Sequence, residues 1–369
     1  MIFRLTSKKP VLVIGNGARE AGELKLIHRF IEKTQIPVLT SLNTVDMAQD
    51  KNKIGFIGTH GNRAANMIIA ECDLLISVGM RLGLRQIGRD PKKFAPNAHL
   101  IRADIDQYEL SRQIKEDEEK YLIDAKEFML KLLEEDIPQY SEWSDKCFQL
   151  RDYLEGIDDE IGNLAVKKIS SLLPENPIIA VDIGQHMCWC AQSLTLKGND
   201  GRILIGGSYG SMGVGLPYAI GASIYQKKER VFCITGDGGL QMNIQELETV
   251  VREKLPIKLL VLNNHALGKI SEVQEKSYGC RFSLTTEESG YSVPDFEKVA
   301  VAYGIKAATL SSYDSLDDYA EWLSDDDPCL LNITLPWDTK LIPKIDFNTM
   351  EVLPKLDTQI MEEAMKIIS

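Results

Sequence analysis

Short runs of β-branched and aliphatic residues alternate with stretches of helical periodicity along the first part of the chain. The run VLVIG is typical of a buried strand, and the apolar positions after it recur at the spacing of one helix face. Strands that alternate with helices form parallel sheets with crossover connections, so we expect a central six-stranded Rossmann-like domain. Its expected strands are 11–15, 37–41, 73–79 and 99–106, and its expected helices are 18–33 and 62–71.

A second α/β series follows a polar, aromatic stretch without strand patterns. The expected strands are 177–184, 203–207, 231–234, a run within 256–268, a weak strand near Lys306, and 329–335; the expected helices are 185–193, 212–225, 242–254, 296–303, 315–323 and a short one at the end. A length of 369 residues fits two moderate domains. We therefore predict two Rossmann-like parallel-sheet α/β domains at 1–135 and 157–340, a linker or bridging helix at 136–156, and a tail at 341–369.

The composition excludes several classes of function. Asp and Glu outnumber Lys and Arg by 54 to 42, and this acidic balance argues against binding to nucleic acid or an anionic membrane surface. The longest apolar runs are far below the roughly 20 residues of a membrane span. Because strand-like residues come almost at once, we expect no signal peptide, and the seven cysteines include no CxxC pair. We expect reduced structural thiols and a cytoplasmic protein.

Two expected strand ends carry unusual polar residues. One is GDGG, which contains Asp237, and the other is LNNHALG, which contains Asn264. The 24 residues between Gly238 and Asn263 allow one helix and the next parallel strand. Because ligands bind at the carboxyl ends of parallel strands, we expect Asp237 and Asn264 to lie side by side at that edge.

These residue types suit a metal-bound diphosphate. A carboxylate, an amide oxygen and a nearby backbone carbonyl are hard ligands, and with two phosphate oxygens and a water they complete an octahedron around Mg²⁺. The glycines let the backbone approach the phosphates and free N–H groups at the start of a helix to bind them. A turn with an N-capping aspartate is the simpler explanation of an isolated GDG, but the NN pair at this spacing favours the ligand site.

The GDG triplet, the spacing and the NN pair together resemble the signature of thiamine-diphosphate (ThDP) enzymes. GDGGLQMNIQELETVV, GSMGVGLPYAIGA and VDIGQHMCW are similar to the diphosphate-binding domain of the acetolactate synthase group. GTHGNRAANMIIAECDLLISVGMR and KFAPNAHLIRADID are similar to the central domain of that group. The resemblance covers nearly the whole chain.

The resemblance implies a set of site residues. Asp237, Asn264 and the carbonyl of Ala266 correspond to the Mg²⁺ ligands, and Gln185 and His186 to the pair that hydrogen-bonds the diphosphate. A satisfied core histidine is the alternative for His186. The implied cofactor-binding set is Gln185, His186, Gly210, Ser211, Met212, Gly236, Gly238, Gly239, Met242, Asn264, Ala266 and Leu267.

Met212 and Arg85 are the two residues to which the resemblance assigns a catalytic role. Met212 resembles the residue that supports the bent conformation of the cofactor, although both Met212 and Met242 could simply fill gaps in the core. Arg85, in RLGLR, aligns with an arginine that receives the carboxylate of a second keto acid, a task that suits a bidentate guanidinium. A surface ion pair is the alternative for Arg85.

The implied reaction is a decarboxylating carboligation that joins a two-carbon unit from pyruvate to a second carbonyl acceptor, a keto acid or a keto-sugar. A ThDP-dependent decarboxylase or oxidase, and a non-catalytic cofactor-binding half-subunit, stay open as alternatives. Val273 stands where these synthases carry a tryptophan that favours 2-ketobutyrate, and Lys269 replaces an apolar residue. RLGLRQIG, TTEESGYSVPDF and LIPKIDF look closer to synthase-like enzymes of surface-sugar gene clusters.

Two further features depart from the family pattern. The family has an N-terminal pyrimidine-binding domain with an activating glutamate, which this sequence lacks. We expect a homodimer or tetramer, or a complex with a separate pyrimidine-binding chain, and no turnover by this chain alone. FAD is a candidate second cofactor, but GNGARE lacks the G-x-G-x-x-G spacing and RLGLR lacks the aspartates of the corresponding family loop.

Overall fold

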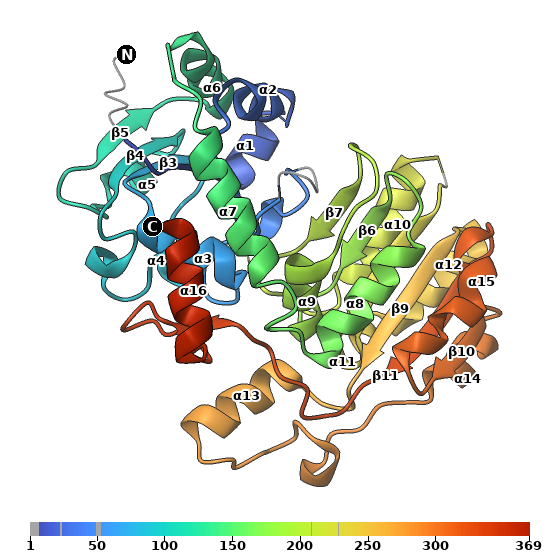
Figure 1. Ribbon diagram of the computed structural model, residues 1–369. Helices are drawn as coiled ribbons and strands as arrows, with labels where there is room; N and C mark the ends of the chain where they lie inside the picture. Colours follow the sequence, from blue (N-terminus) through green and yellow to red (C-terminus); the bar gives the residue numbers. More distant parts are fainter. Residues whose placement is uncertain (1–6, 23, 49–52, 208, 228) are drawn as a thin grey trace. The chain divides into compact units, whose positions relative to one another are not determined.

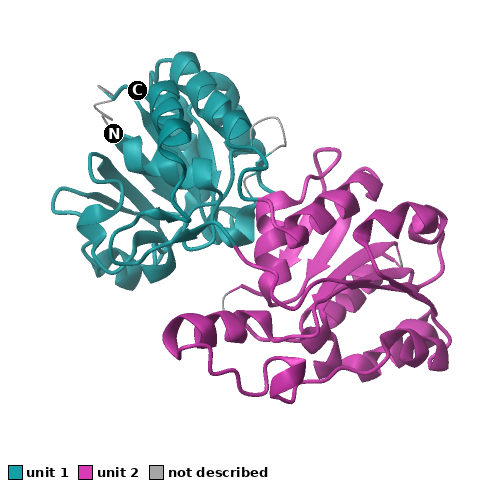
Figure 2. Cartoon of the chain, turned by 60° about the horizontal axis from the view of Figure 1, so that its bottom comes forward, with its two compact units in different colours: residues 1–158, 342–369 teal, residues 159–341 magenta. Residues whose placement is uncertain are grey.

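The computed structural model describes residues 7–22, 24–48, 53–207, 209–227 and 229–369. The chain divides into two compact units, one made of Met1–Asp158 with Ile342–Ser369 and the other of Asp159–Leu341 (Figure 2). Each unit contains a parallel sheet with helices packed on it, which confirms the predicted fold class. The segment 136–156 contains helix α7, and both this helix and the C-terminal residues belong to the first unit.

The parallel sheet of the first unit has five described strands in the order β2-β1-β3-β4-β5. Strands β3, β4 and β5 are labelled in Figure 1. The strands are β1 (Pro10–Ile14), β2 (Val38–Thr40), β3 (Leu74–Val78), β4 (His99–Asp104) and β5 (Glu119–Leu122). The helices are α1 (Asn16–Glu20), α2 (Leu24–Thr34), α3 (Arg63–Glu71), α4 (Leu84–Ile87), α5 (Gln107–Ser111), α6 (Ala125–Glu134), α7 (Ser141–Tyr153) and α16 (Thr358–Ile368). A two-stranded antiparallel ribbon joins β12 (Lys344–Ile345) to β13 (Val352–Leu353).

The prediction of six strands in this sheet was wrong for the described residues. Phe56 makes one isolated parallel bridge with Thr40, but no strand forms around it. Gly55 and Gly58 on either side have positive φ, which is incompatible with extended strand geometry. The predicted helix 18–33 is also interrupted, because Gly22 adopts a left-handed conformation between α1 and α2.

The second unit has six described strands in the order β10-β11-β9-β8-β6-β7, again with all neighbours parallel (Figure 1). They are β6 (Ile178–Val181), β7 (Arg202–Ile205), β8 (Val231–Gly236), β9 (Ile257–Asn263), β10 (Lys306–Leu310) and β11 (Cys329–Thr334). The helices are α8 (Ile161–Leu172), α9 (Gln185–Ser193), α10 (Gly215–Tyr225), α11 (Asp237–Met242), α12 (Leu247–Glu253), α13 (Gly268–Ser277), α14 (Phe296–Ala302) and α15 (Ala320–Ser324). Every residue of β8 and β9 is buried, as expected for strands covered on both faces.

Two helix boundaries in the second unit differ from the prediction in a way that affects the site. Helix α10 begins at Gly215, so Met212 lies in the turn before it and is not helical. The expected helix 242–254 is divided at Asn243, so Met242 is the last residue of α11. Both methionines therefore lie in the segments that surround the GDG turn.

No described helix combines the length and the apolar composition needed to span a membrane. All seven cysteines lie in the described part of the chain, where no disulfide joins them; only Cys280 is exposed.

Candidate functional site

The GDG and NN segments meet at one edge of the second sheet. Strands β8 and β9 pair in parallel register, with Gly236 opposite Leu262. Asp237 follows β8 as the first residue of α11, and Asn264 follows β9 directly. The structure therefore places the two polar side chains at adjacent strand ends, as the spacing predicted.

Asp237 is a buried carboxylate with one oxygen left without a partner. Its residue exposure is 3%. Oδ1 accepts a hydrogen bond from the Gly238 N–H at 2.9 Å, whereas Oδ2 is buried and makes no hydrogen bond of normal geometry. Burial raises the pKa of Asp237 to about 6, against the opposing effects of the Gly238 N–H, His265, the Tyr291 hydroxyl and the Ala266 N–H. A bound cation is the kind of partner that this oxygen lacks.

The glycines around Asp237 are required by close packing. A Cβ on Gly236 would lie 3.0 Å from the His186 ring, and one on Gly238 would lie 2.8 Å from Leu267 Cδ2. A Cβ on Gly239 would approach Asp182 Oδ2 to 2.5 Å. The turn can therefore carry no side chain on these residues without displacing its neighbours.

Asp182 organises the site, and the sequence analysis assigned it no role. Its buried carboxylate accepts hydrogen bonds from the N–H groups of Gly213 (2.9 Å) and Val214 (3.2 Å) and from Thr235 Oγ1 (3.0 Å). These contacts connect the end of β6, the end of β8 and the turn after Met212. A carboxylate directly after a strand, in VDIGQH, was the available signal, but its partners lie more than 30 residues away in sequence.

His186 is buried against the GDG turn. Its ring lies close to both Gly184 and Gly236, and Nε2 is buried without a hydrogen-bond partner. Burial lowers the pKa of His186, and the nearby Asp182 opposes this shift. The unpaired nitrogen does not match the alternative of a satisfied core histidine, because such a side chain would have partners for both nitrogens.

Gln185 makes all its described contacts with protein groups. Nε2 donates to Glu272 Oε1 at 3.1 Å and to Thr339 O at 3.0 Å, and Oε1 accepts from Asn264 Nδ2 at 3.3 Å. A carboxylate and a carbonyl can only accept, so these two partners determine the orientation of the Gln185 amide. Asn264 must then present its nitrogen to Gln185, which leaves Asn264 Oδ1 available to a cation.

We expect the Gln185→Met variant to unfold more easily, by about 1–3 kcal/mol, because Glu272, Thr339 and Asn264 would each lose a buried hydrogen-bond partner. Urea denaturation of the ligand-free protein measures this change. Gln245→Met is the control, because Gln245 is exposed. Equal stability of the two variants would contradict the buried network.

Met212 and Met242 lie beside the turn. Met212 Cε is 3.2 Å from the position of a Cβ on Gly238, and Met242 Cβ is 2.5 Å from that on Gly213. Both side chains are exposed, by 37% and 57%, so neither fills a gap in the core of this chain. Gly210 and Ser211 are exposed in the turn before Met212.

Ala266 and Leu267 continue the edge after Asn264. Ala266 is buried and forms an isolated antiparallel bridge with Thr286, while the Leu267 N–H donates to Thr285 O at 2.9 Å. No described group of three or more His, Cys, Asp or Glu side chains could hold a metal ion. The predicted ligand set contains only one side chain of these four types, the Asp237 carboxylate, together with one amide and one backbone carbonyl.

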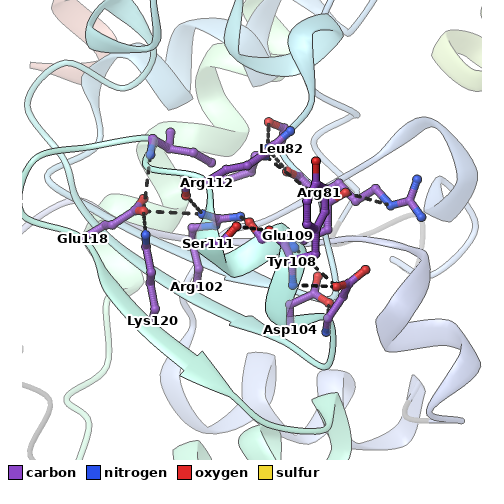
Figure 3. A network of polar contacts seen from close by, with 12 residues as sticks. Arg81, Leu82, Arg102, Asp104, Tyr108, Glu109, Ser111, Arg112, Glu118 and Lys120 are labelled. Atoms are coloured by element: carbon purple, nitrogen blue, oxygen red, sulfur yellow. Dashed lines mark hydrogen bonds and ion pairs between the residues drawn. The ribbon is translucent and has the colours of Figure 1, made fainter.

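Arg85 belongs to the first unit. Its side chain is exposed, and its carbonyl accepts a hydrogen bond from the Thr59 N–H at 2.7 Å. The residues before α4, the helix that contains Arg85, are held by Arg112, whose Nη2 donates to Leu82 O at 3.0 Å (Figure 3). The guanidinium of Arg102, buried on β4, donates to the carbonyls of Arg112 and Glu109 (Figure 3). This network holds the residues just before α4, the helix that carries Arg85.

The GNG turn between β1 and α1 packs against backbone. A Cβ on Gly17 would lie 2.8 Å from Gly79 Cα, and one on Gly15 would lie 2.6 Å from Met80 Cα. The close approach to the end of β3 is enough to explain both glycines. The turn therefore gives no separate indication of FAD.

Together these features define a class: a two-unit parallel α/β protein with a glycine-rich turn, a buried carboxylate and an adjacent amide at paired strand ends. The profile described as "Thiamine pyrophosphate enzyme, C-terminal TPP binding domain" matches residues 182–333, and that described as "Thiamine pyrophosphate enzyme, central domain" matches residues 5–132. Thiamine pyrophosphate is another name for ThDP. The chain belongs to the thiamine pyrophosphate enzymes.

The most similar relatives include three acetolactate synthase large subunits. The chain is 33% identical to isozyme 2 of Escherichia coli K12 over 337 residues, which cover 89% of this chain and 60% of that protein. It is 33% identical to the Lactococcus lactis large subunit over 92% of this chain and 60% of the relative, and 33% identical to that of Pyropia yezoensis over 83% and 53%. The chain thus spans 60% or less of the length of these relatives.

Proposed function

We propose that this chain provides the diphosphate- and Mg²⁺-binding part of a ThDP-dependent carboligase of acetolactate synthase type. The observation that carries the proposal is the buried Asp237 carboxylate, whose Oδ2 makes no hydrogen bond of normal geometry, beside Asn264 at the paired ends of β8 and β9. The names of the relatives support the type of reaction.

The residues present fit this cofactor. Asp237, Asn264 and the Ala266 carbonyl would hold Mg²⁺, and the unpaired His186 Nε2 and the backbone N–H groups of the glycine turn would lie against the diphosphate. The exposed Met212 side chain would support the rest of the cofactor. When bound, ThDP supplies the carbon nucleophile and the electron sink for decarboxylation of a 2-keto acid.

The proposal includes pyruvate as donor, a keto acid or keto-sugar as acceptor, and Arg85 as the residue that binds an acceptor carboxylate. It also includes an assembly in which a pyrimidine-binding domain completes the site, since the relatives are longer than the matched segment. FAD is left out, because packing against Gly79 already accounts for the GNG turn.

Product analysis tests the reaction type. The chain is incubated with pyruvate, ThDP, Mg²⁺ and the pyrimidine-binding domain of a relative, and we expect acetolactate with one equivalent of CO₂. Adding a keto-sugar should give a product enlarged by a two-carbon unit if that is the better acceptor. Acetaldehyde or acetate as the sole product would replace the carboligase by a decarboxylase or an oxidase. The Asp237→Ala variant is the negative control.

A further inference from the structure

The segment that follows α13 lies against the proposed cofactor site and is held there by backbone contacts. The bridge between Ala266 and Thr286 and the bond from the Leu267 N–H to Thr285 O attach this segment to the end of β9. The Tyr291 N–H donates to Thr286 O at 3.0 Å. The backbone of Tyr291 is therefore positioned beside the residues that follow β9.

The Tyr291 hydroxyl lies over the residue that follows Asp237. A Cβ placed on Gly238 would be 3.1 Å from Tyr291 Oη, 2.8 Å from Leu267 Cδ2 and 3.2 Å from Met212 Cε. The phenol thus approaches the same glycine as Leu267 and Met212, two residues of the predicted cofactor-binding set, although the sequence analysis did not select it.

The same hydroxyl is buried without a well-formed hydrogen bond to the protein. Tyr291 Oη and Asp237 Oδ2 are both buried and neither makes a hydrogen bond of normal geometry, although the phenol is close enough to interact with the Asp237 carboxylate and with Gln241. Leaving a buried polar group poorly satisfied costs free energy, so two such groups that face the same turn indicate a position that a ligand completes. A neutral phenol at pH 7 can donate one hydrogen bond, whereas the carboxylate can only accept. The pair therefore suits a ligand with an anionic oxygen next to a cation.

We propose that Tyr291 Oη donates a hydrogen bond to the diphosphate group of the cofactor, next to the cation held by Asp237. This inference rests on the proposed function, because it assigns one more binding residue to the same site. Tyr291 adds a side-chain donor from a segment outside the GDG, NN and GQH motifs. It would distinguish this site from one in which backbone N–H groups and His186 alone contact the anion.

Calorimetric titration of the Tyr291→Phe variant tests the proposal. The full chain is titrated with ThDP, and separately with inorganic diphosphate, in excess Mg²⁺. Loss of a hydrogen bond to a charged group should weaken both affinities by about tenfold or more. Tyr278→Phe is the matched control, because Tyr278 is 54% exposed at the end of α13, and its affinities should stay within about twofold of wild type.

Thermal unfolding separates ligand binding from a structural role. Without ligand the melting temperature of Tyr291→Phe should stay close to that of wild type, since Oη makes no hydrogen bond of normal geometry, and only the increase caused by ThDP with Mg²⁺ should shrink. If the variant binds both ligands as tightly as wild type, whether or not it is less stable without ligand, the proposed role of Tyr291 is wrong but the proposed function is unaffected. A wild-type protein that binds neither ligand in a Mg²⁺-dependent way overturns the proposed function and this inference together.

Discussion

Replacing Asp237 with alanine is expected to abolish Mg²⁺-dependent binding of ThDP. The proposed ligand set contains one carboxylate, so the variant would offer the cation only the Asn264 amide and the Ala266 carbonyl. Mutating a residue that only contacts a metal ligand typically lowers metal affinity about 10- to 100-fold. Removing the ligand itself should therefore lower the Mg²⁺-dependent affinity for ThDP by more than about 100-fold. Calorimetry with ThDP at increasing Mg²⁺ concentrations measures it.

The ligand-free Asp237→Ala protein should be no less stable than wild type. Burial opposes ionisation of this carboxyl, and this cost offsets the loss of the hydrogen bond that Oδ1 accepts from the Gly238 N–H. Asp326→Ala is the control, because the Asp326 side chain is 94% exposed in the same unit. Unchanged ThDP affinity in Asp237→Ala, or binding that ignores Mg²⁺ in the wild type, would remove the basis of the site.

Replacing Lys258 with methionine is expected to destabilise the second unit by about 3 kcal/mol. Lys258 lies on β9 with no exposed surface, and its ammonium group donates to Trp322 O at 2.6 Å and Asp325 Oδ1 at 2.7 Å. It also donates to the carbonyl of Asp327. Methionine would leave these acceptors without their donor, although Lys306 would still contact Asp325.

Urea denaturation at pH 7 measures the loss of stability in Lys258→Met. Lys298→Met is the control, because the Lys298 side chain is 85% exposed. The pKa of Asp325 is lowered to about 2, because Lys258 and Lys306 outweigh the opposing effect of burial. A lowered carboxyl pKa stabilises the fold above its ordinary value of about 4 and loses this effect as the pH falls towards the folded value. The difference between wild type and Lys258→Met should therefore narrow below about pH 4. Equal stabilities at pH 7 would contradict the stabilising role of the buried Lys258 ammonium group.

Much of the architecture could be predicted from local patterns. The buried strands β8 and β9 are continuous apolar runs, and their spacing was enough to bring Asp237 and Asn264 to one edge of a parallel sheet. The prediction failed where single glycines control the backbone. Gly22 ends a helix that periodicity extended, and Gly55 and Gly58, both with positive φ, lie on either side of Phe56, which forms only an isolated bridge. Periodicity describes which side of an element is buried, whereas these interruptions depend on individual φ angles.

The candidate site was predicted only in part, for a different reason. Glycines, the carboxylate and the amide form a short motif whose chemistry can be recognised without a structure. Asp182 and Tyr291 belong to no such motif, because their roles come from partners distant in sequence: Gly213 and Val214 for Asp182, and the GDG turn for Tyr291. Gln185 was expected to contact the diphosphate, a role that stays a prediction, while its described hydrogen bonds are made to Glu272, Thr339 and Asn264.

By itself the sequence determined the α/β class, the strand ends that carry polar residues and the family, because apolar periodicity and residue chemistry are local properties of a chain. Only the tertiary structure decided which polar atoms remain unpaired, since pairing depends on contacts between segments far apart in sequence. Asp237 was selected from its motif, but the unpaired Oδ2 became visible only after the fold had satisfied Oδ1. The same is true of the Tyr291 hydroxyl, which is an ordinary residue of a polar loop until folding brings it over Gly238.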